Sequence, residues 1–352
     1  MKADIKYFED FDEFLFNNKN STSSYLLYVA SKTLLDIKTL QGTKLKLYGA
    51  FFPQIIYNNK LYDEGVISFE IETNMEAVCI NDIEHCTIKS EDFKNIESVI
   101  TLLDGFSSFN ESFLSKLYAS VDLNTNIIGG GAGSIQDSLE GALFTNEGFV
   151  NNSAILIKLK IPIDIGVRHG WQYLKGPFLA TKSEKNRLAQ IDYKSALKVY
   201  SEVIEEDCGQ KLTAENFLEL AKNYPIGIVK YKGEQIVRDP IAFEDNSLVL
   251  VGEIKENSII NILTGEKEDL LKAAKSAADE AVKSDCRFIM LFDCVSRVGF
   301  LDTAFDDELK IISSNTHAST IMGAITIGEI ANQGKKFIHF YNKTCVVGGI
   351  CF

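Results

Sequence analysis

The first segment with residue types suited to chemistry is a glycine run at residues 129–134, GGGAGS. Glycine-rich loops can bind phosphate through backbone N–H groups. This run, however, lacks the Gly-Lys-Ser/Thr of a P-loop and the G-x-G-x-x-G spacing of a dinucleotide site. We therefore expect a turn or close packing between sheets, where side chains would not fit. An opening for a small ligand beside Gly129 and Gly130 is compatible with that expectation.

A second segment, His169-Gly170-Trp171, holds the only tryptophan and one of the four histidines. A histidine beside a glycine and a large aromatic ring could coordinate a metal or haem iron, or hydrogen-bond a ligand that stacks on the indole. The competing interpretation is a structural histidine at a strand end, since intermediate burial is ordinary for His and Trp. Arg168, just before it, could meet a carboxylate.

Cys294 and Arg297 lie three residues apart where a predicted strand ends. A thiol near a guanidinium can have a lowered pKa, which would suit a reactive cysteine or an anion site. An inert buried cysteine is the commoner case, and no histidine is adjacent in sequence to act as a base. Further on, Glu329 follows Gly328 and could bind a ligand amine or pair with an arginine such as Arg297 or Arg238. The alternative is a solvated acid on a strand edge.

The elements that must position these residues recur three times along the chain. Residues 25–71, 101–159 and 290–350 each read as an apolar strand, a helix, a strand closing in a glycine pair, and a hairpin. The pairs are Gly49-Ala50, Gly129-Gly130 and Gly323-Ala324. Helical spacing of apolar residues from Phe113 to Val121, behind Asn110 as a helix N-cap, contrasts with strand alternation at 155–159.

Two β-meanders, at 153–192 and 226–254, separate the second and third segments. Between them we expect helices at 193–205 behind Asp192 and at 214–222 behind Thr213, stopped by Pro225. A long helix follows, with a stripe of Leu270 and alanines that suits close packing on a sheet. The predicted fold class is α+β: mainly antiparallel twisted sheets with helices packed outside, and a domain boundary near Tyr224-Pro225.

Composition excludes several classes of function. The formal charge is −13, from 36 Lys and Arg against 49 Asp and Glu, and such an acidic balance disfavours nucleic-acid and membrane-surface partners. No stretch reaches the roughly 18–20 apolar residues of a transmembrane helix, and the N-terminus does not resemble a secretory signal. Seven scattered cysteines, an odd number, indicate reduced thiols in a cytoplasmic protein. No recognised catalytic motif occurs, so we do not expect an enzyme.

In order and spacing, these landmarks resemble the FIST family of bacterial intracellular sensory domains. The resemblance places a FIST N-terminal domain at 1–223 and a FIST C-terminal domain at 224–352. In the N-terminal region the residues that match the family pattern are 129–133, 151–157, His169-Gly170-Trp171, 180–182, 191–192 and Ala196. In the C-terminal region they are 224–227, Arg238, Cys294, Arg297, Gly323, Gly328-Glu329 and 342–344.

The resemblance implies a cytoplasmic sensor of signal transduction that binds a small ligand, with an amino-acid-like ligand favoured. Because the third segment ends at Phe352, we expect the signal to pass to a separate partner such as a histidine kinase, a diguanylate cyclase or a chemotaxis protein. A subset of the family binds haem and responds to nitric oxide. This chain has Tyr341 where many relatives place a histidine, with His339 two residues earlier, so His169 would be the better axial ligand.

Four hypotheses follow, in order of preference: a small-ligand sensor without cofactor or metal, a haem-based nitric-oxide sensor, an enzyme that uses Cys294 as nucleophile, and a pure interaction scaffold. The first predicts a pocket where the two halves of the chain meet. Its expected ligand contacts are His169, Gly170, Trp171, Arg238, Cys294, Arg297, Gly328, Glu329, Gly129 and Gly130.

Overall fold

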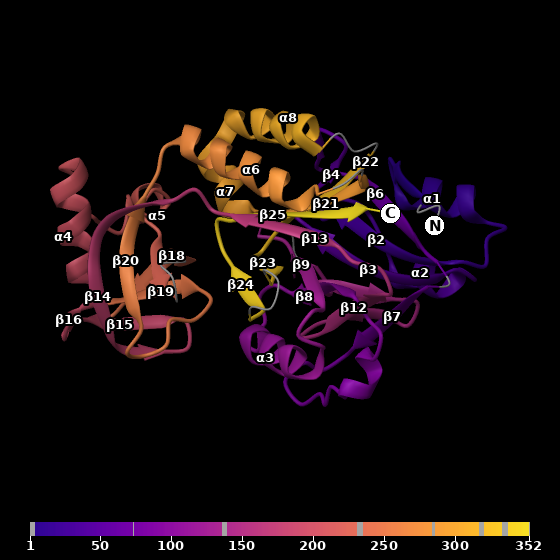
Figure 1. Cartoon of the computed structure of the whole chain (residues 1–352), viewed down its shortest axis with the longest axis horizontal. Coiled ribbons are helices and arrows are strands. Elements are labelled where there is room, and N and C mark those ends of the chain that lie inside the picture. Colours follow the sequence, from indigo (N-terminus) through magenta and orange to yellow (C-terminus); the bar gives the residue numbers. More distant parts are fainter. Residues whose placement is uncertain are drawn as a thin grey trace.

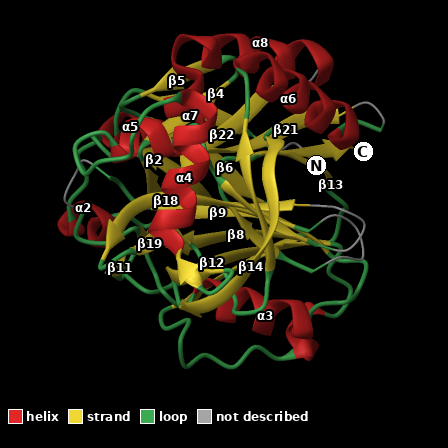
Figure 2. Ribbon diagram, turned by 90° about the vertical axis from the view of Figure 1, so that its left-hand side faces the viewer, coloured by secondary structure: helices red, strands yellow, loops and turns green. Residues whose placement is uncertain are grey.

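The computed structural model describes residues 4–72, 74–135, 139–230, 235–283, 286–316, 320–332 and 337–351. Three mixed six-stranded sheets lie at one end of the molecule, and a closed barrel lies at the other (Figure 1). Helices cover the outside of the sheets (Figure 2). The fold is therefore α+β, as the sequence predicts. No described helix combines the length and apolar character needed to cross a membrane.

The three recurring segments each build the centre of one sheet. Each centre is a pair of parallel strands joined through one or two helices. The last strand of each repeat then pairs with the first strand on its other side and runs antiparallel to it. The predicted repeat is confirmed. The strands and helices are β2 (Ser24–Ala30), α2 (Ile37–Gly42), β3 (Lys46–Phe52) and β6 (Val66–Ile71); β8 (Ser98–Asp104), α3 (Asn110–Ser120), β9 (Asn126–Ala132) and β12 (Ala154–Leu159); and β21 (Cys286–Cys294), α7 (Val295–Leu301), α8 (Phe305–Thr316), β22 (Thr320–Thr326) and β25 (Cys345–Cys351).

The repeats also exchange strands in a ring. The strand that follows each glycine-containing strand pairs with a different repeat: β4 (Gln54–Tyr57) with β22, β10 (Leu143–Thr145) with β3, and β23 (Glu329–Ala331) with β9. Each sheet is therefore completed by a neighbouring repeat, and the three share one core that includes Tyr28, Leu102 and Phe292. None of the three can form its full sheet alone.

Glycines at matching positions allow this close assembly. Gly49, Gly129 and Gly323 lie opposite Leu27, Thr101 and Leu291 in the parallel pairs. A Cβ atom on Gly129 or Gly323 would lie within 3.0 Å of the carbonyl oxygen of its partner. The glycine run 129–132 is thus the buried strand β9, which confirms close packing rather than a phosphate loop.

The barrel contains strands from both sides of Tyr224-Pro225, so that dipeptide lies inside one structural unit. Its strand order closes through the pairing of β14 with β15, and α4 (Ala196–Cys208) and α5 (Phe217–Ala221) connect its two halves. The strands are, in spatial order, β14 (Gln172–Glu184), β20 (Ile259–Thr264), β17 (Ile226–Val229), β18 (Gln235–Glu244), β19 (Ser247–Val251), β15 (Arg187–Ile191) and β16 (Lys194–Ser195).

Predicted helix starts differ from the structure for local reasons. Asp192 and Tyr193 have φ of +48° and +63° and form the turn between β15 and β16, so Ser195 caps α4 instead. Asn110 is the first residue of α3 rather than its N-cap, because its side-chain amide donates to the carbonyl oxygen of Asp104. Helix α5 is shorter than the predicted 214–222 and begins at Phe217.

Helix α6 (Lys267–Ala281) packs on the sheet formed by β21, β25 and β13 (Asp164–Arg168), beside α8 (Figure 2). Its predicted small-residue stripe is fully buried. A Cβ on Gly166 of β13 would lie within 3.0 Å of the carbonyl oxygen of Ala277, so both surfaces must be small. The other elements are β1 (Ile5–Phe8), α1 (Phe11–Asn18), β5 (Lys60–Tyr62), β7 (Met75–Ile80), β11 (Gly148–Val150), β24 (His339–Tyr341) and 3₁₀ turns at Ser90–Phe93 and Asp302–Ala304.

Cysteine chemistry differs in one place from the expectation. Cys286, at the start of β21, is disulfide-bonded. The cysteines at 79, 86, 208, 294 and 345 are free. The expectation that every thiol is reduced is therefore wrong.

Candidate functional site

A large cleft lies between the barrel and the three-sheet body, and residues from both sides of Tyr224-Pro225 line it. Its volume is about 1690 Å³, which exceeds the roughly 300–1,000 Å³ of an ordinary small-molecule pocket. The barrel contributes β17, β18 and the segment after β19, and the body contributes α3, α6 and β24 (Figure 1). The link between β13 and β14 crosses from one part to the other along the same cleft.

Four predicted contact residues line this cleft: His169, Gly170, Trp171 and Arg238. Gly170 has φ of +85°, and a Cβ there would lie 2.8 Å from the Cα of Leu270. Only glycine therefore lets the chain turn from β13 into β14 against α6. The other six predicted contacts do not line the cleft, and the role of all ten in ligand binding stays a prediction.

The Trp171 indole supports the wall of the cleft rather than offering a free face. It is 3% exposed, and its Nε1–H donates to the carbonyl oxygen of Lys343 at 3.2 Å. The Phe300 ring packs edge-on with ring centroids 4.7 Å apart, and the Lys343 ammonium lies 5.4 Å from the indole centroid. Burial, the hydrogen bond and the cation–π contact together hold the link between β13 and β14 in place.

His169 is neutral at physiological pH. Its pKa falls to about 4, first because of burial and then because of the positive charges of Arg297 and Arg168. The Nδ1 atom accepts the backbone N–H of Trp171 at 2.9 Å, so the neutral ring carries its hydrogen on Nε2. His169 is therefore a hydrogen-bond donor at Nε2 and an acceptor at Nδ1.

This geometry does not fit haem ligation by His169. An axial histidine binds iron through a ring nitrogen lone pair, usually while the other nitrogen donates its hydrogen to a neighbour. Here Nδ1 accepts a hydrogen bond and Nε2 holds the hydrogen, which is the opposite arrangement. The hydrogen-bonding of His169 therefore does not support it as an axial ligand of haem.

Arg238 ties the barrel to the body at the cleft. From β18 its guanidinium donates to Glu111 of α3 at 2.7 Å and to the carbonyl oxygen of Phe340 in β24 at 2.8 Å. Its Nε–H donates to the carbonyl oxygen of Glu253 at 2.9 Å. The side chain is nearly fully buried, so most of its hydrogen-bonding capacity serves the interface and little is left for a ligand anion.

Arg297 is buried and fully engaged away from the cleft. Its guanidinium forms a two-pronged ion pair with Glu308, at 2.7 and 3.1 Å, and donates to the carbonyl oxygens of His169 and Leu270. Asp293 lies 3.6 Å from the Arg297 Nε. Burial, followed by repulsion from Glu308, raises the pKa of Asp293 well above its usual range. Arg297 therefore holds α6, α7, α8 and the β13–β14 link together.

Glu329 and Cys294 also face the interior. The Glu329 carboxylate accepts the hydroxyl of Thr326 at 2.9 Å and the N–H of Thr344 at 3.2 Å. Burial raises its pKa to about 8, although the hydrogen bonds act in the opposite direction. Glu329 is fully buried, so the interpretation as a solvated acid is wrong. Burial likewise raises the pKa of the Cys294 thiol, which gives no support to a reactive nucleophile.

Three glycines that the sequence suggested as ligand contacts allow close packing inside the fold. A Cβ on Gly130 would lie within 3.0 Å of the Thr326 side chain, and Gly129 lies opposite Thr101 in the sheet. Gly328 has φ of +92°, and a Cβ there would collide with the Phe340 ring. These positions let β9 and the turn before β23 pack closely.

Sequence reasoning missed three polar side chains at the interface and cleft. Lys343 is fully buried, and its ammonium contacts Asp239 of β18 at 3.2 Å and the carbonyl oxygen of Lys222. Glu111 and Glu253 line the cleft. The only sequence signal was the position of Lys343 within the 342–344 landmark, because the side chains of Lys343 and Glu111 find their partners more than a hundred residues away in sequence.

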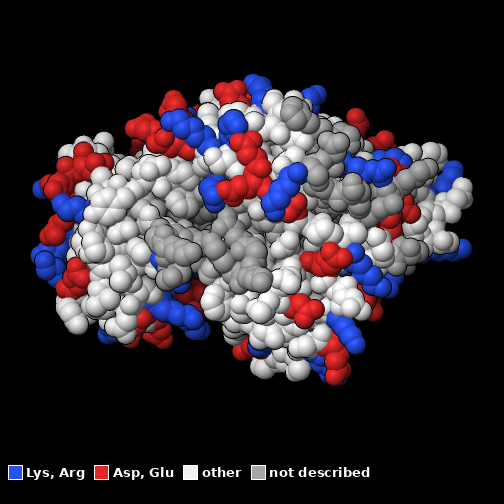
Figure 3. Space-filling view, in the orientation of Figure 1, with Lys and Arg blue, Asp and Glu red and all other residues white. Residues whose placement is uncertain are grey.

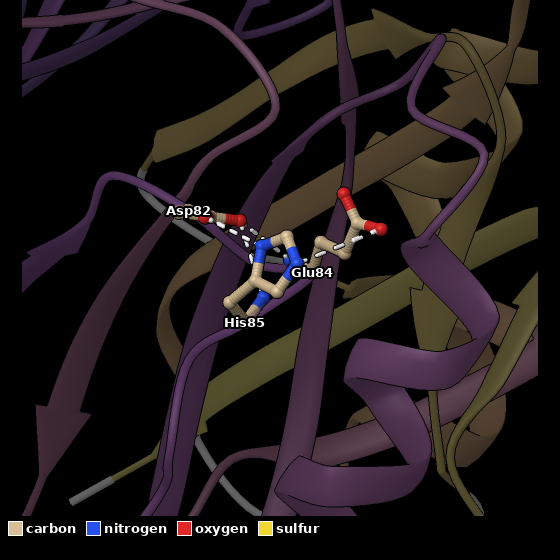
Figure 4. Close-up of side chains that lie close together, drawn as sticks. All are labelled: Asp82, Glu84 and His85. Carbon is tan, nitrogen blue, oxygen red and sulfur yellow. Dashed lines mark hydrogen bonds and ion pairs between the residues drawn. The ribbon is translucent and has the colours of Figure 1, made fainter.

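Charged side chains also lie on the surface away from the cleft. Figure 3 shows acidic and basic residues interspersed over one face of the molecule. Figure 4 shows the exposed His85 ring between Asp82 and Glu84, after β7. The His85 Nδ1 lies 2.9 Å from Asp82, and this bond raises the histidine pKa. These side chains satisfy one another at the surface.

Comparison with protein families agrees with the sequence landmarks. The FIST N domain matches residues 28–194, and the FIST C domain matches residues 196–332. The first match ends in β16 of the barrel and the second begins at α4. This junction lies about thirty residues before Tyr224-Pro225, where the sequence suggests a division. No curated protein matches the chain. FIST domains are associated with sensing in signal transduction. With both domains matched over most of its length, the chain belongs to the FIST family.

Proposed function

We propose that this protein is a cytoplasmic sensory protein of signal transduction whose small ligand binds in the cleft between the barrel and the body. The observation that carries the proposal is the cleft itself, which joins elements from both FIST regions around about 1690 Å³. Concave sites between structural units are where small ligands most often bind.

The lining favours an amino-acid-like ligand. The body supplies Arg168 and Lys272, which pair with Glu280 and Asp269, and the barrel supplies Glu253 together with Lys230 and Lys255, so both signs of charge line the cleft. Apolar side chains such as Leu114 and Ile236 lie among them. A ligand with both an ammonium and a carboxylate would find complementary groups on opposite structural units.

Ligand binding across two units also offers a route for a signal. A ligand that contacts both walls can bind one arrangement of barrel and body more tightly than another. It then shifts the equilibrium between the two arrangements by the difference between its two binding free energies. Arg238 and Lys343 already couple β18 to α3 and the β24–β25 turn. We propose that this change is passed to a separate histidine kinase, diguanylate cyclase or chemotaxis protein.

The test measures ligand binding by native mass spectrometry and thermal unfolding against a panel of the standard L-amino acids. A ligand at a hundred times its dissociation constant stabilises the folded state by about 2.7 kcal/mol. Ser115→Trp adds an indole to the cleft wall on α3 and should abolish this stabilisation. Lys198→Trp adds the same group to the exposed face of α4, outside the cleft lining, and should leave it unchanged.

Two results would contradict the proposal. One is the absence of both a bound small molecule and any stabilisation across the panel. The other is binding that Ser115→Trp leaves intact, which would place the ligand elsewhere.

A further inference from the structure

One carboxylate in the cleft is held in position but lacks a cationic partner. Glu253 lies just after β19, at the barrel rim. Its backbone N–H donates to the Glu111 carboxylate at 3.0 Å, and its carbonyl oxygen accepts the Nε–H of Arg238 at 2.9 Å. In the part of the chain that the structure describes, no side chain forms an ion pair or hydrogen bond with the Glu253 carboxylate. The backbone is thus fixed on both sides while the acid faces the cleft.

The guanidinium that contacts the Glu253 backbone is already committed to other groups. Arg238 directs Nη2 to Glu111 at 2.7 Å and Nη1 to the carbonyl oxygens of Phe340 and Val237. Glu111, Arg238 and Glu253 therefore carry a net charge of −1 in a partly buried place. Burial and then the charge of Glu111 raise the pKa of Glu253, while the positive charges of Lys255, Arg238 and Lys185, in that order, lower it. A cation bound here would remove this repulsion.

Two apolar side chains of the cleft lining, each 2% exposed, lie on the elements that hold Glu253 in place. Leu114 lies one turn after Glu111 on α3, and Ile236 lies two residues before Arg238 on the same face of β18. Both line the cleft. The group that binds beside Glu253 can therefore carry a hydrocarbon body as well as a positive charge.

We propose that Glu253 is the residue that binds the ammonium group of a primary-amine ligand in this cleft, with Leu114 and Ile236 contacting the adjoining hydrocarbon. This inference rests on the proposed function, since it concerns the same cleft, and it names the ligand class and the residue that selects it. Glu329, the residue that the sequence suggested for an amine, is fully buried and accepts hydrogen bonds from Thr326 and Thr344, so Glu253 is the acid of the two that lines the cleft.

The first test compares amines with matched compounds that lack the charge. Each standard L-amino acid is compared with its N-acetyl derivative, and n-butylamine is compared with n-butanol, by calorimetric titration of the full chain. An ammonium hydrogen-bonded to a carboxylate contributes on the order of 10- to 100-fold in affinity. We expect the charged member of each binding pair to bind more tightly by about this factor.

The second test removes the charge from the protein. Glu253→Gln keeps the shape of the side chain, and it should lower the affinity for amines by the same factor while leaving the N-acetyl compounds and n-butanol unchanged. Glu219→Gln is the matched control, because Glu219 is exposed on α5 and lies outside the cleft lining. Should Glu253→Gln fail to fold, the paired compounds on the wild-type protein decide alone.

The outcomes separate this inference from the proposed function. Cleft binding that is indifferent to N-acetylation, or to Glu253→Gln, would overturn the amine assignment and leave the sensor proposal standing. Binding of n-butylamine that depends on Glu253, without binding of any amino acid, would support the amine site and count against the amino-acid ligand. If n-butylamine binds the wild-type protein no better than n-butanol does, the inference is wrong.

Discussion

Replacing Asp293 and Glu308, separately and together, tests how the buried guanidinium of Arg297 is neutralised. Glu308 makes two direct hydrogen bonds to Arg297, whereas Asp293 lies 3.6 Å away and has a strongly raised pKa. We infer that Asp293 holds a proton at neutral pH and that Arg297 pairs directly with Glu308. The two acids therefore share one negative charge opposite one positive charge.

The expected costs follow from that charge balance. Asp293→Asn replaces a neutral acid by a neutral amide, so it should cost less than about 1 kcal/mol. Glu308→Gln should cost about 1–3 kcal/mol, since Asp293 can ionise once the repulsion from Glu308 is gone. The double variant leaves Arg297 charged and unpaired in the interior, which costs about 3–5 kcal/mol. The loss of unfolding free energy in the double variant should thus exceed the summed losses of the two single variants by about 1–3 kcal/mol.

Chemical denaturation of the four proteins, with the midpoint and the slope fitted separately, measures these free energies of unfolding. Asp307→Asn is the control, because Asp307 pairs with Lys310 at the surface and should contribute below about 1 kcal/mol. Single-variant costs that add up to the cost of the double variant would refute the shared-charge interpretation. A large loss from Asp293→Asn alone would show that Asp293 is the ionised acid.

Three further predictions concern other buried groups. The folded protein keeps a proton on Glu329 between the usual pKa of 4.5 and about 8, whereas the unfolded chain loses it. The free energy of unfolding of the wild-type protein should therefore fall as pH rises through that window, by up to about 1.4 kcal/mol per pH unit. A Glu329→Gln variant that shows the same fall would contradict this. Gly129→Ala should destabilise the fold by about 3 kcal/mol or more, whereas Gly299→Ala, in open space on α7, should be neutral or stabilise by up to about 1 kcal/mol; similar melting temperatures for both would argue against close packing. In native protein a maleimide should label exposed Cys208 well before buried Cys294, and mass spectrometry of quenched samples showing equal rates would contradict the burial.

The repeats illustrate what local patterns can predict. Apolar runs, helical spacing and glycine pairs indicated three strand–helix–strand units, and the structure contains all three, with the two strands of each unit parallel. These features depend on residues close in sequence. The exchange of β4, β10 and β23 among the repeats could not be predicted, because strand pairing between segments so far apart in sequence leaves no periodic signal.

The candidate site shows the same division. His169, Gly170, Trp171 and Arg238 were identified from landmark residues and do line the cleft. Arg297 and Glu329 were identified for the same reason, yet the fold buries them beside Glu308 and Thr326. A charged residue in a sequence carries no mark of whether its partner is a ligand or another side chain.

The sequence by itself determined the α+β class, the threefold repeat and the membership in the FIST family, since each depends on order and local spacing along the chain. Only the tertiary structure decided which polar residues meet. It brought Glu111 and Arg238 together from α3 and β18, and it placed Glu253 against them with its carboxylate in the cleft. The physical reason is that ion pairs and clefts form where distant segments pack, and packing of that kind is fixed by the whole core rather than by any one segment.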